Sequence, residues 1–266
     1  MSTGTRPIKL FQFPRMFAIP NLSPFCCKME TWLRIADVPY EVVDLPDPRK
    51  GPRGKLPFIE DGGERIADTA HIIEHLKRTR GVDPDAHLDE AQRALFLLVQ
   101  RTLEEHYGFV LAYTHLVHDD GLRHTRSRFD AIPGFIRPFV ARAVKKQVKA
   151  ILWQQGLLRH SHDEIMRSAI ADWTAVLSVM SKGPFFFGEK PTGLDATVFG
   201  TLASTVLTPI ESPIRDFLRA KPEVVAYAER VRSRFFPELA EEAGRGGAAT
   251  KRKKEADDGQ GLSAHG

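Results

Sequence analysis

The residues best placed to do chemistry lie at the start of a predicted helix, in the run Ser23-Pro24-Phe25-Cys26-Cys27. Serine is a favoured N-cap and proline suits the first helical position, so we expect the helix to begin here. The N-terminus of a helix offers free N–H groups and about half a positive charge, and a hydroxyl beside it can stabilise an anion such as a thiolate. Ser23 is therefore a candidate catalytic residue, with a plain N-cap as the structural alternative.

Cys26 is the second candidate at this helix. It stands where a Cys-x-x-Cys oxidoreductase has its second cysteine, and Ser23 takes the place of the first. Dithiol exchange then lacks its attacking thiol. Two roles stay open for Cys26: a thiol that forms a mixed disulfide, or a buried packing residue. Cys27 lies about 100° further round the helix and is predicted to pack.

One further pattern, His71-x-x-Glu74-His75, matches the H-x-x-E-H motif of zinc peptidases. It lies on a short helix directly after Asp68-Thr69, and the sequence offers no obvious third ligand beside it. We therefore predict no metal site.

The elements that position these residues are readable from the apolar pattern. The predicted elements are strands at 8–11 and 40–45 around the Ser23 helix, then a hairpin at 56–67 with the turn Asp61-Gly62-Gly63, and a helix over 69–79. A strand–helix–strand unit implies parallel pairing with a right-handed crossover. The order βαβ followed by ββα is that of the thioredoxin fold, which we predict for residues 6–81.

Residues 88–240 show helical periods throughout, so we predict an all-helical second domain. Three capping boxes mark helix starts, at Asp89/Gln92, Ser161/Glu164 and Thr192/Asp195. After the first of them, residues 95–113 are expected to form one apolar face that includes Leu98. The stretch 135–153 is basic and amphipathic, and it predicts either a helix with one packed and one solvated face or a helix that lies on an anionic membrane.

The length, composition and cysteine content restrict the number of domains and the cellular location that we expect. The chain has 266 residues with 42% hydrophobic content, which suits two ordinary domains. Neither a signal sequence nor a run of about 18 apolar residues is present, so no transmembrane segment is expected. The two cysteines are adjacent and cannot form a disulfide framework, which favours a reducing, cytoplasmic location.

The net charge of +4 is largely local, because Lys251, Arg252, Lys253 and Lys254 lie in a Gly/Ala-rich segment. Residues 244–266 are predicted to be a disordered basic tail. The remaining charge is close to balanced, and we predict no nucleic-acid partner.

Five segments carry a resemblance to a known family. They are 23–28 (SPFCCK), 54–61 (GKLPFIED), 66–69 (IADT), 155–161 (QGLLRHS) and 187–196 (FGEKPTGLDA). On these segments the chain resembles the glutathione S-transferase superfamily and, within it, the branch that contains metaxins and the failed-axon-connections proteins. The resemblance implies a thioredoxin-like glutathione-binding domain, an all-helical domain and glutathione as co-substrate.

The resemblance also assigns roles to single positions. Ser23 takes the place of the residue that activates the glutathione thiol, and Cys26 could instead form a mixed disulfide with glutathione. A cis bond before Pro57 would expose backbone groups to the cysteinyl unit. Asp68-Thr69 replaces the family's acidic or Gln residue followed by Ser, which binds the γ-glutamyl end, with a plain N-cap as the alternative role of Asp68. The implied glutathione-binding residues are Arg15, Asn21, Lys55, Leu56, Pro57, Asp68 and Thr69.

Two functions follow from this resemblance. The first is a glutathione transferase that conjugates a small hydrophobic electrophile without a metal, with His106, Tyr107, Phe109 and Tyr113 as residues that either face the electrophile or pack in the core. The second is a non-catalytic, metaxin-like binding or scaffold protein on a membrane surface. Many members of the family dimerise, so a homodimer fits either function.

Overall fold

The computed structural model describes residues 7–129 and 132–239. Its N-terminal elements are β1 (Ile8–Gln12), α1 (Pro24–Ile35), β2 (Tyr40–Asp44), the 3-10 turn η1 (Pro48–Lys50), β3 (Phe58–Asp61), β4 (Glu64–Ala67) and α2 (Thr69–Arg80). The sheet order is β2-β1-β3-β4, with β1 parallel to β2 and antiparallel to β3. This is the predicted thioredoxin-like fold.

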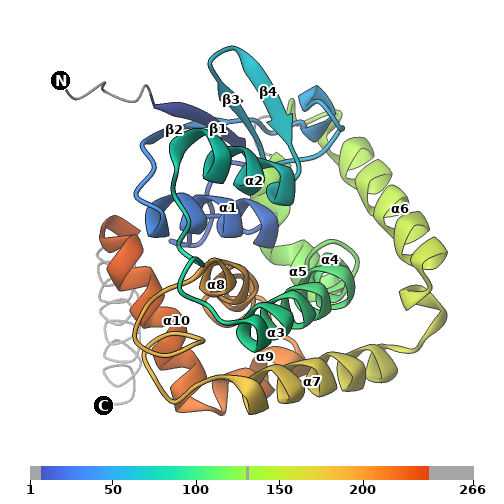
Figure 1. The fold of residues 1–266 in the computed structure, drawn as a ribbon. Coiled ribbons are helices and arrows are strands. Elements are labelled where there is room, and N and C mark those ends of the chain that lie inside the picture. Colours follow the sequence, from blue (N-terminus) through green and yellow to red (C-terminus); the bar gives the residue numbers. More distant parts are fainter. Residues whose placement is uncertain (1–6, 130–131, 240–266) are drawn as a thin grey trace, which may run out of the picture.

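Local signals explain these elements. The hairpin between β3 and β4 turns at Gly62 and Gly63, which have φ angles of 61° and 91° that glycine adopts without strain. Helix α1 buries Met29, Trp32 and Leu33 against the sheet, and Figure 1 shows α1 and α2 between the sheet and the other helices. The core of this domain therefore lies between the sheet and these two helices.

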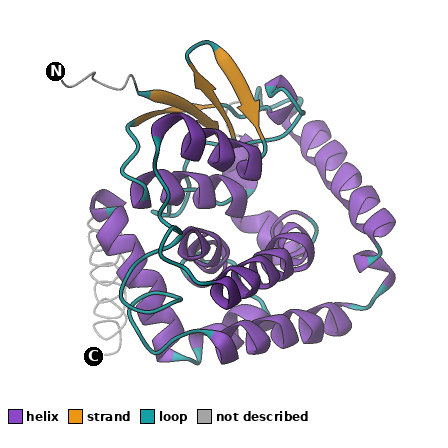
Figure 2. Cartoon of the chain, viewed as in Figure 1, coloured by secondary structure: helices purple, strands orange, loops and turns teal. Residues whose placement is uncertain are grey.

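The second half is helical, as predicted (Figure 2). Its elements are α3 (Glu90–Arg101), the π-helical η2 (Thr102–Tyr107), α4 (Gly108–Leu116), α5 (Asp119–His124), η3 (Arg126–Phe129), α6 (Arg137–Gln155), η4 (Leu157–Arg159), α7 (His162–Val179), α8 (Gly193–Val206), α9 (Pro213–Arg219) and α10 (Pro222–Phe235). All three predicted capping boxes are present, at the starts of α3, α7 and α8.

The π-helical segment corrects the predicted apolar face of the long helix. Val99, Leu103, Tyr107 and Leu111 are buried at steps of four residues, whereas Leu98 is 66% exposed. A π-helical turn holds more residues than an α-helical turn, so the buried face moves by one position relative to a regular α pattern.

Helix α8 is the centre of the helical domain, and it also contacts the sheet domain. Ala196 belongs to the apolar cluster under the sheet, and Gly200 lies against the first turn of α1. A Cβ atom at Gly200 would stand 2.6 Å from the Pro24 carbonyl oxygen, so only glycine allows this approach. The buried ion pair between Lys28 of α1 and Glu104 of η2, at 2.5 Å, joins the same two domains.

Helix α6 packs one face only in part, because Val140, Val144 and Val148 are half-buried and Val148 lies against the helical core. It runs along the edge of the helical domain in Figure 1, and Leu152 is its one buried residue. None of the helices within residues 7–129 and 132–239 is both long and apolar enough to cross a lipid bilayer. The predicted tail at 244–266 lies outside the described residues.

Candidate functional site

Ser23 forms the start of α1, as the sequence predicts. Its Oγ accepts a hydrogen bond from the Cys26 backbone N–H at 3.5 Å, and its own N–H donates to Asn21 Oδ1 at 3.0 Å. A serine hydroxyl carries one hydrogen, and no acceptor for it lies among the described residues. The Ser23 hydroxyl is therefore available to donate to a ligand at the positive end of α1.

Three separate segments meet beside this helix start. Cys26 of α1 packs in one apolar cluster with Leu56 and Phe58, which flank Pro57, and with Ala67, which precedes Asp68. The cluster therefore brings the helix N-terminus, the proline turn and the start of α2 to one place. These are the segments that the resemblance assigns to glutathione binding.

The Leu56–Pro57 peptide bond is cis, as predicted. Leu56 and Pro57 are buried, while Lys55 is exposed and forms no ion pair with any residue in the described ranges. An unpaired ammonium next to this turn can bind the carboxylate of a ligand.

Asp68 is the N-cap of α2, and its carboxylate accepts from the Ala70 N–H at 3.0 Å. Its backbone has a φ of 80°, a region that costs a non-glycine residue about 1–3 kcal/mol. The side chain is exposed and its second carboxylate oxygen has no partner within residues 7–129 and 132–239. Thr69 is buried beneath it. Asp68 is thus held in a strained position with an oxygen free to bind an ammonium group.

Both cysteines are fully buried in the structure. Desolvation, together with the nearby Glu30, raises the pKa of the Cys27 thiol well above its usual range, which makes it unreactive at neutral pH. Cys26 packs among apolar side chains, which accords with the packing alternative. Its mixed-disulfide role stays a prediction.

Arg15 and Asn21 have partners inside the protein. The Asn21 amide is fully buried and donates to the Phe13 carbonyl at 2.5 Å while accepting from Ser23. Arg15 forms an ion pair with the buried Glu30 of α1. These side chains hold the β1–α1 loop in place, and a direct contact of either with glutathione stays a prediction.

A polar network surrounds Glu30, and it could not be predicted from the sequence. This fully buried carboxylate accepts from Gln12 Nε2 at 2.7 Å and from the Tyr40 hydroxyl at 3.0 Å, besides its contact with Arg15. Burial and the Glu30 charge raise the Tyr40 pKa above its usual range. A glutamate seven residues after Ser23 gives no sequence signal of burial, because its partners come from separate strands and loops.

A cavity of about 290 Å³ lies beside the β1–α1 loop. Its lining is mostly apolar and consists of Phe13, Pro14, Arg15, Met16, Asn21, Leu22, Pro46 and Ser127. The residues expected to face an electrophile lie elsewhere. Tyr107 and Tyr113 are buried in the helical core, Phe109 packs against it, and His106 pairs with Asp172 at 2.5 Å. The apolar cavity is therefore built mainly by the β1–α1 loop, which leads into Ser23.

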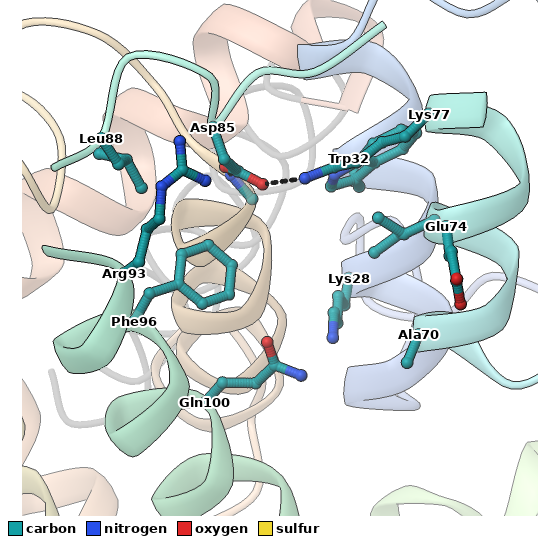
Figure 3. Close-up of a pocket in the computed structure, with 12 residues that line it drawn as sticks. Lys28, Trp32, Ala70, Glu74, Lys77, Asp85, Leu88, Arg93, Phe96 and Gln100 are labelled. Atoms are coloured by element: carbon teal, nitrogen blue, oxygen red, sulfur yellow. Dashed lines mark hydrogen bonds and ion pairs between the residues drawn. The ribbon is translucent and has the colours of Figure 1, made fainter. Parts of the chain in front are cut away.

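A second cavity, of about 400 Å³, lies between α1, α2 and α3 (Figure 3). Trp32 and Phe96 face it from opposite walls, and the dashed line marks the ion pair of Lys77 with Asp85 at 2.9 Å. Asp85 also accepts from the Gly193 N–H at 2.7 Å, so it ties the interdomain connection to the start of α8. This cavity lies at the interface between the two domains, and Ser23 is not among its lining residues.

The zinc-like motif is not assembled as a metal site. His75 pairs with Asp61 at 2.9 Å, and His71 is exposed. Within the part of the chain that the structure describes, no group of three or more His, Cys, Asp or Glu side chains could hold a metal ion.

Comparisons with known proteins agree with this geometry. A model described as "Glutathione S-transferase N-terminal domain" matches residues 24–121, and one described as "Glutathione S-transferase, C-terminal domain" matches residues 169–231. The chain belongs to the glutathione S-transferase superfamily.

Within the superfamily, the chain is similar to proteins of two kinds. "Failed axon connections" of Drosophila melanogaster is 31% identical over 250 residues, which are 87% of this chain and 58% of that protein. Metaxin-1 of Homo sapiens is 27% identical over 87% of this chain and 52% of its own length. The chain thus spans little more than half of these two relatives. The "Isoprene-epoxide--glutathione S-transferase" of Rhodococcus sp. (strain AD45) is 27% identical over 86% of this chain and 99% of its own length.

A solved structure shares the fold. The glutathione S-transferase of Ceriporiopsis subvermispora in complex with glutathione aligns with a TM-score of 0.56 and 16% identity, over 85% of this chain and 97% of that one.

Proposed function

We propose that this protein binds glutathione at the N-terminus of α1 and transfers it to a small hydrophobic electrophile. The observation that carries the proposal is the apolar cluster of Cys26, Leu56, Phe58 and Ala67, because it brings Ser23, the cis-proline turn and Asp68 together. The Rhodococcus relative, named for an epoxide and glutathione, supports the same chemistry.

Each group at the site has a matching part of the tripeptide. The Ser23 hydroxyl donates to the sulfur, Asp68 accepts from the γ-glutamyl ammonium, and Lys55 attracts the glycyl carboxylate. The backbone of Leu56 pairs with the cysteinyl unit. The electrophile would occupy the 290 Å³ cavity beside the β1–α1 loop.

The reaction needs no metal. The glutathione thiol releases its proton to water, and the helix N-terminus and Ser23 stabilise the thiolate. The sulfur then attacks the electrophilic carbon, so a C–S bond forms and the bond to the leaving group breaks. In an epoxide the breaking bond is a C–O bond, and the oxygen takes a proton from water.

Calorimetric titration of glutathione into the purified protein tests binding. We expect sub-millimolar affinity, and the absence of detectable binding at several millimolar would contradict the proposal. Conjugation rates against pH then test the role of the hydroxyl. Ser23→Ala should lower turnover at neutral pH by roughly 10², by analogy with the loss of one donor to a developing anion.

A matched variant separates chemistry from stability. Ser23→Ala also removes an N-cap, as does Ser161→Ala at the start of α7, and each should cost about 1 kcal/mol of stability. Only Ser23→Ala should lower turnover. Cys26→Ala should do much less, and the reverse result would assign the chemistry to mixed-disulfide exchange.

The second candidate function is a non-catalytic binding protein. It is favoured by the similarity to metaxin-1 and by the internal partners of Arg15 and Asn21, which leave fewer groups for a ligand. A folded protein that neither binds nor conjugates glutathione would support it.

We also propose a cytoplasmic location and a homodimer. Neither of the two cysteines forms a disulfide, which supports a reducing compartment. Imaging of a tagged full-length protein tests the location, and analytical ultracentrifugation tests the dimer.

A further inference from the structure

Helix α6 exposes large apolar side chains that a folded domain normally buries. Phe139 is 66% exposed, Trp153 56% and Ile151 46%, and Phe135 just before the helix is 79% exposed. The other large apolar side chains of the domain are mostly in its core. An exposed apolar strip of this kind marks an interaction surface.

The outward surface of α6 divides into two strips along the helix axis. At 100° per residue, Phe139, Ala143 and Ala150 fall within about 40° of one another, whereas Ile151 lies about 120° from Phe139, between the half-buried Val140 and Val144. Arg142, Lys146 and Lys149 form a parallel basic strip beside them. Trp153 lies within the basic strip, about 40° round the helix from Phe139, and the nineteen residues extend about 28 Å.

The charge of this helix has one sign. Residues 133–155 contain no Asp or Glu and include five Arg or Lys residues. Arg142, Lys146 and Lys149 form no ion pair with residues in the described ranges, whereas Lys145 lies 3.5 Å from Asp119. Unpaired cations beside apolar side chains attract an anionic surface.

A basic cavity continues the strip toward the body of the protein. It lies between α5 and α6, has a volume of about 480 Å³, and is lined by five cationic side chains and the Asp119 carboxylate. Two of the cations have carboxylate partners, because Arg123 pairs with Asp120 at 2.5 Å and Lys145 with Asp119 at 3.5 Å. The cations are Arg123, Arg126, Arg137, Arg142 and Lys145. Arg142 thus belongs to both the strip and the cavity.

We propose that α6 binds the surface of a membrane rich in anionic phospholipids. The apolar strip enters the boundary between headgroups and acyl chains, the lysine and arginine side chains reach the phosphates, and the cavity between α5 and α6 takes one headgroup. This combination of aromatic and basic residues on a helix that does not span is typical of interfacial helices. A second copy of the chain would bring the same uncompensated positive charge to this surface, so an anionic partner fits it better.

The inference does not depend on glutathione binding, and vesicle flotation tests it with the full-length protein. We expect binding to vesicles of phosphatidylcholine mixed with phosphatidylserine, no binding to phosphatidylcholine alone, and weakening as salt rises. Changing Arg142, Lys146 and Lys149 together to Gln should weaken binding roughly 100-fold, from a loss of about fivefold for each charge near an anionic surface. The changed side chains are exposed on α6, so the variant should melt like the parent.

Two control variants keep the result specific to α6. Changing Arg78, Lys190 and Arg219 to Gln removes the same charge from exposed positions elsewhere and should leave binding within a factor of two or so of the parent, because these residues lie on other elements. Changing Lys251, Arg252, Lys253 and Lys254 to Ala tests the basic C-terminal segment. The proposal is overturned if the α6 variant binds like the parent, if the C-terminal variant alone abolishes binding, or if the parent binds no anionic vesicles.

Tryptophan fluorescence reports which surface enters the lipid. Trp32 and Trp173 are fully buried and Trp153 is the exposed one, so a blue shift on vesicle binding should come from Trp153. Trp153→Phe should keep the binding and lose the shift. A shift that persists in Trp153→Phe would place the contact elsewhere and contradict the proposal.

Discussion

Helices α8 and α6 belong to the same domain but differ in almost every physical respect. All fourteen residues of α8 are buried, whereas Leu152 is the one buried residue among the nineteen of α6. Yet α8 is rich in hydroxyl groups, and α6 carries several large apolar side chains. Burial in this domain therefore does not follow the polarity of single residues.

The buried helix satisfies its polar groups internally. Thr201, Ser204 and Thr205 donate to carbonyls of the preceding turn, at 3.2, 2.7 and 2.8 Å. The Asp195 carboxylate accepts from four donors, namely the N–H and hydroxyl of Thr192, the Phe186 N–H and the Tyr227 hydroxyl. Helix α8 is thus specified by hydrogen bonds that close within the chain, whereas α6 exposes large apolar side chains to solvent.

The largest expected effect is at Asp195. Replacing it with Ala leaves four buried donors without an acceptor, so Asp195→Ala should lower the free energy of unfolding by about 3–5 kcal/mol. Urea denaturation measures this change. A loss below about 1 kcal/mol would show that water replaces the carboxylate as acceptor. The start of α8 would then be open to solvent, and its contrast with α6 would be smaller.

Asp195→Asn is the matched control, and it adds a pH test. Burial raises the Asp195 pKa, although its hydrogen bonds act in the opposite direction. Because the folded-state pKa lies above the unfolded value, this group contributes most stability below the unfolded pKa and loses it as pH rises through the folded pKa. In Asp195→Asn, the free energy of unfolding should lack this decline with rising pH. If it declines as steeply as in the parent, the pH dependence does not come from Asp195.

Gly200 gives the next effect, because its backbone neighbours cannot move aside. Gly200→Ala places a methyl group 2.6 Å from the Pro24 carbonyl, and overpacking of this kind costs about 1–3 kcal/mol. Gly108→Ala is the control, because a Cβ there meets ordinary contacts of 3.6 Å or more. That change should instead stabilise by up to about 1 kcal/mol through helix propensity. Chemical denaturation measures the free energy of unfolding of both variants. Equal changes in the two would contradict the close approach of Gly200 to Pro24.

Thr192→Ala should cost about 1 kcal/mol. It removes the hydroxyl that donates to Asp195 at 2.9 Å but keeps the backbone donor at 2.7 Å. Glutathione affinity should stay the same, because the residue lies at the start of α8. Denaturant midpoints that match the parent within error would argue against the capping role.

The smallest effect is expected on α6. Phe139→Ser changes an exposed side chain, so the free energy of unfolding should move by no more than about 0.5 kcal/mol. Thermal melting in the absence of lipid measures it. A loss of several kcal/mol would mean that Phe139 is packed in the folded protein, which would contradict its exposure.

The sequence predicted those features whose signals lie within a few neighbouring residues. The three capping boxes, the Gly62-Gly63 turn and the cis bond before Pro57 were all found in the structure. The meeting of Ser23, Pro57 and Asp68 followed from the family resemblance, because nothing local links these positions.

Features that depend on distant partners could not be predicted. The burial of Glu30 needs Gln12, Arg15 and Tyr40 from three other segments. The periodicity of α6 predicts which face is packed but gives no information on how far its neighbours cover that face. The π-helical segment η2 could not be predicted either, because its apolar residues also fit a regular α-helical pattern.

The close approach at Gly200 also bears on cooperativity. Helix α1 lies in the core of the sheet domain and rests on α8 in the other, so neither domain can melt without exposing apolar surface of its neighbour. We therefore expect the two domains to unfold in a single transition, despite their separate folds. A ligand held at Ser23 would raise the melting temperature of the whole molecule, including helices that are more than 150 residues away along the chain.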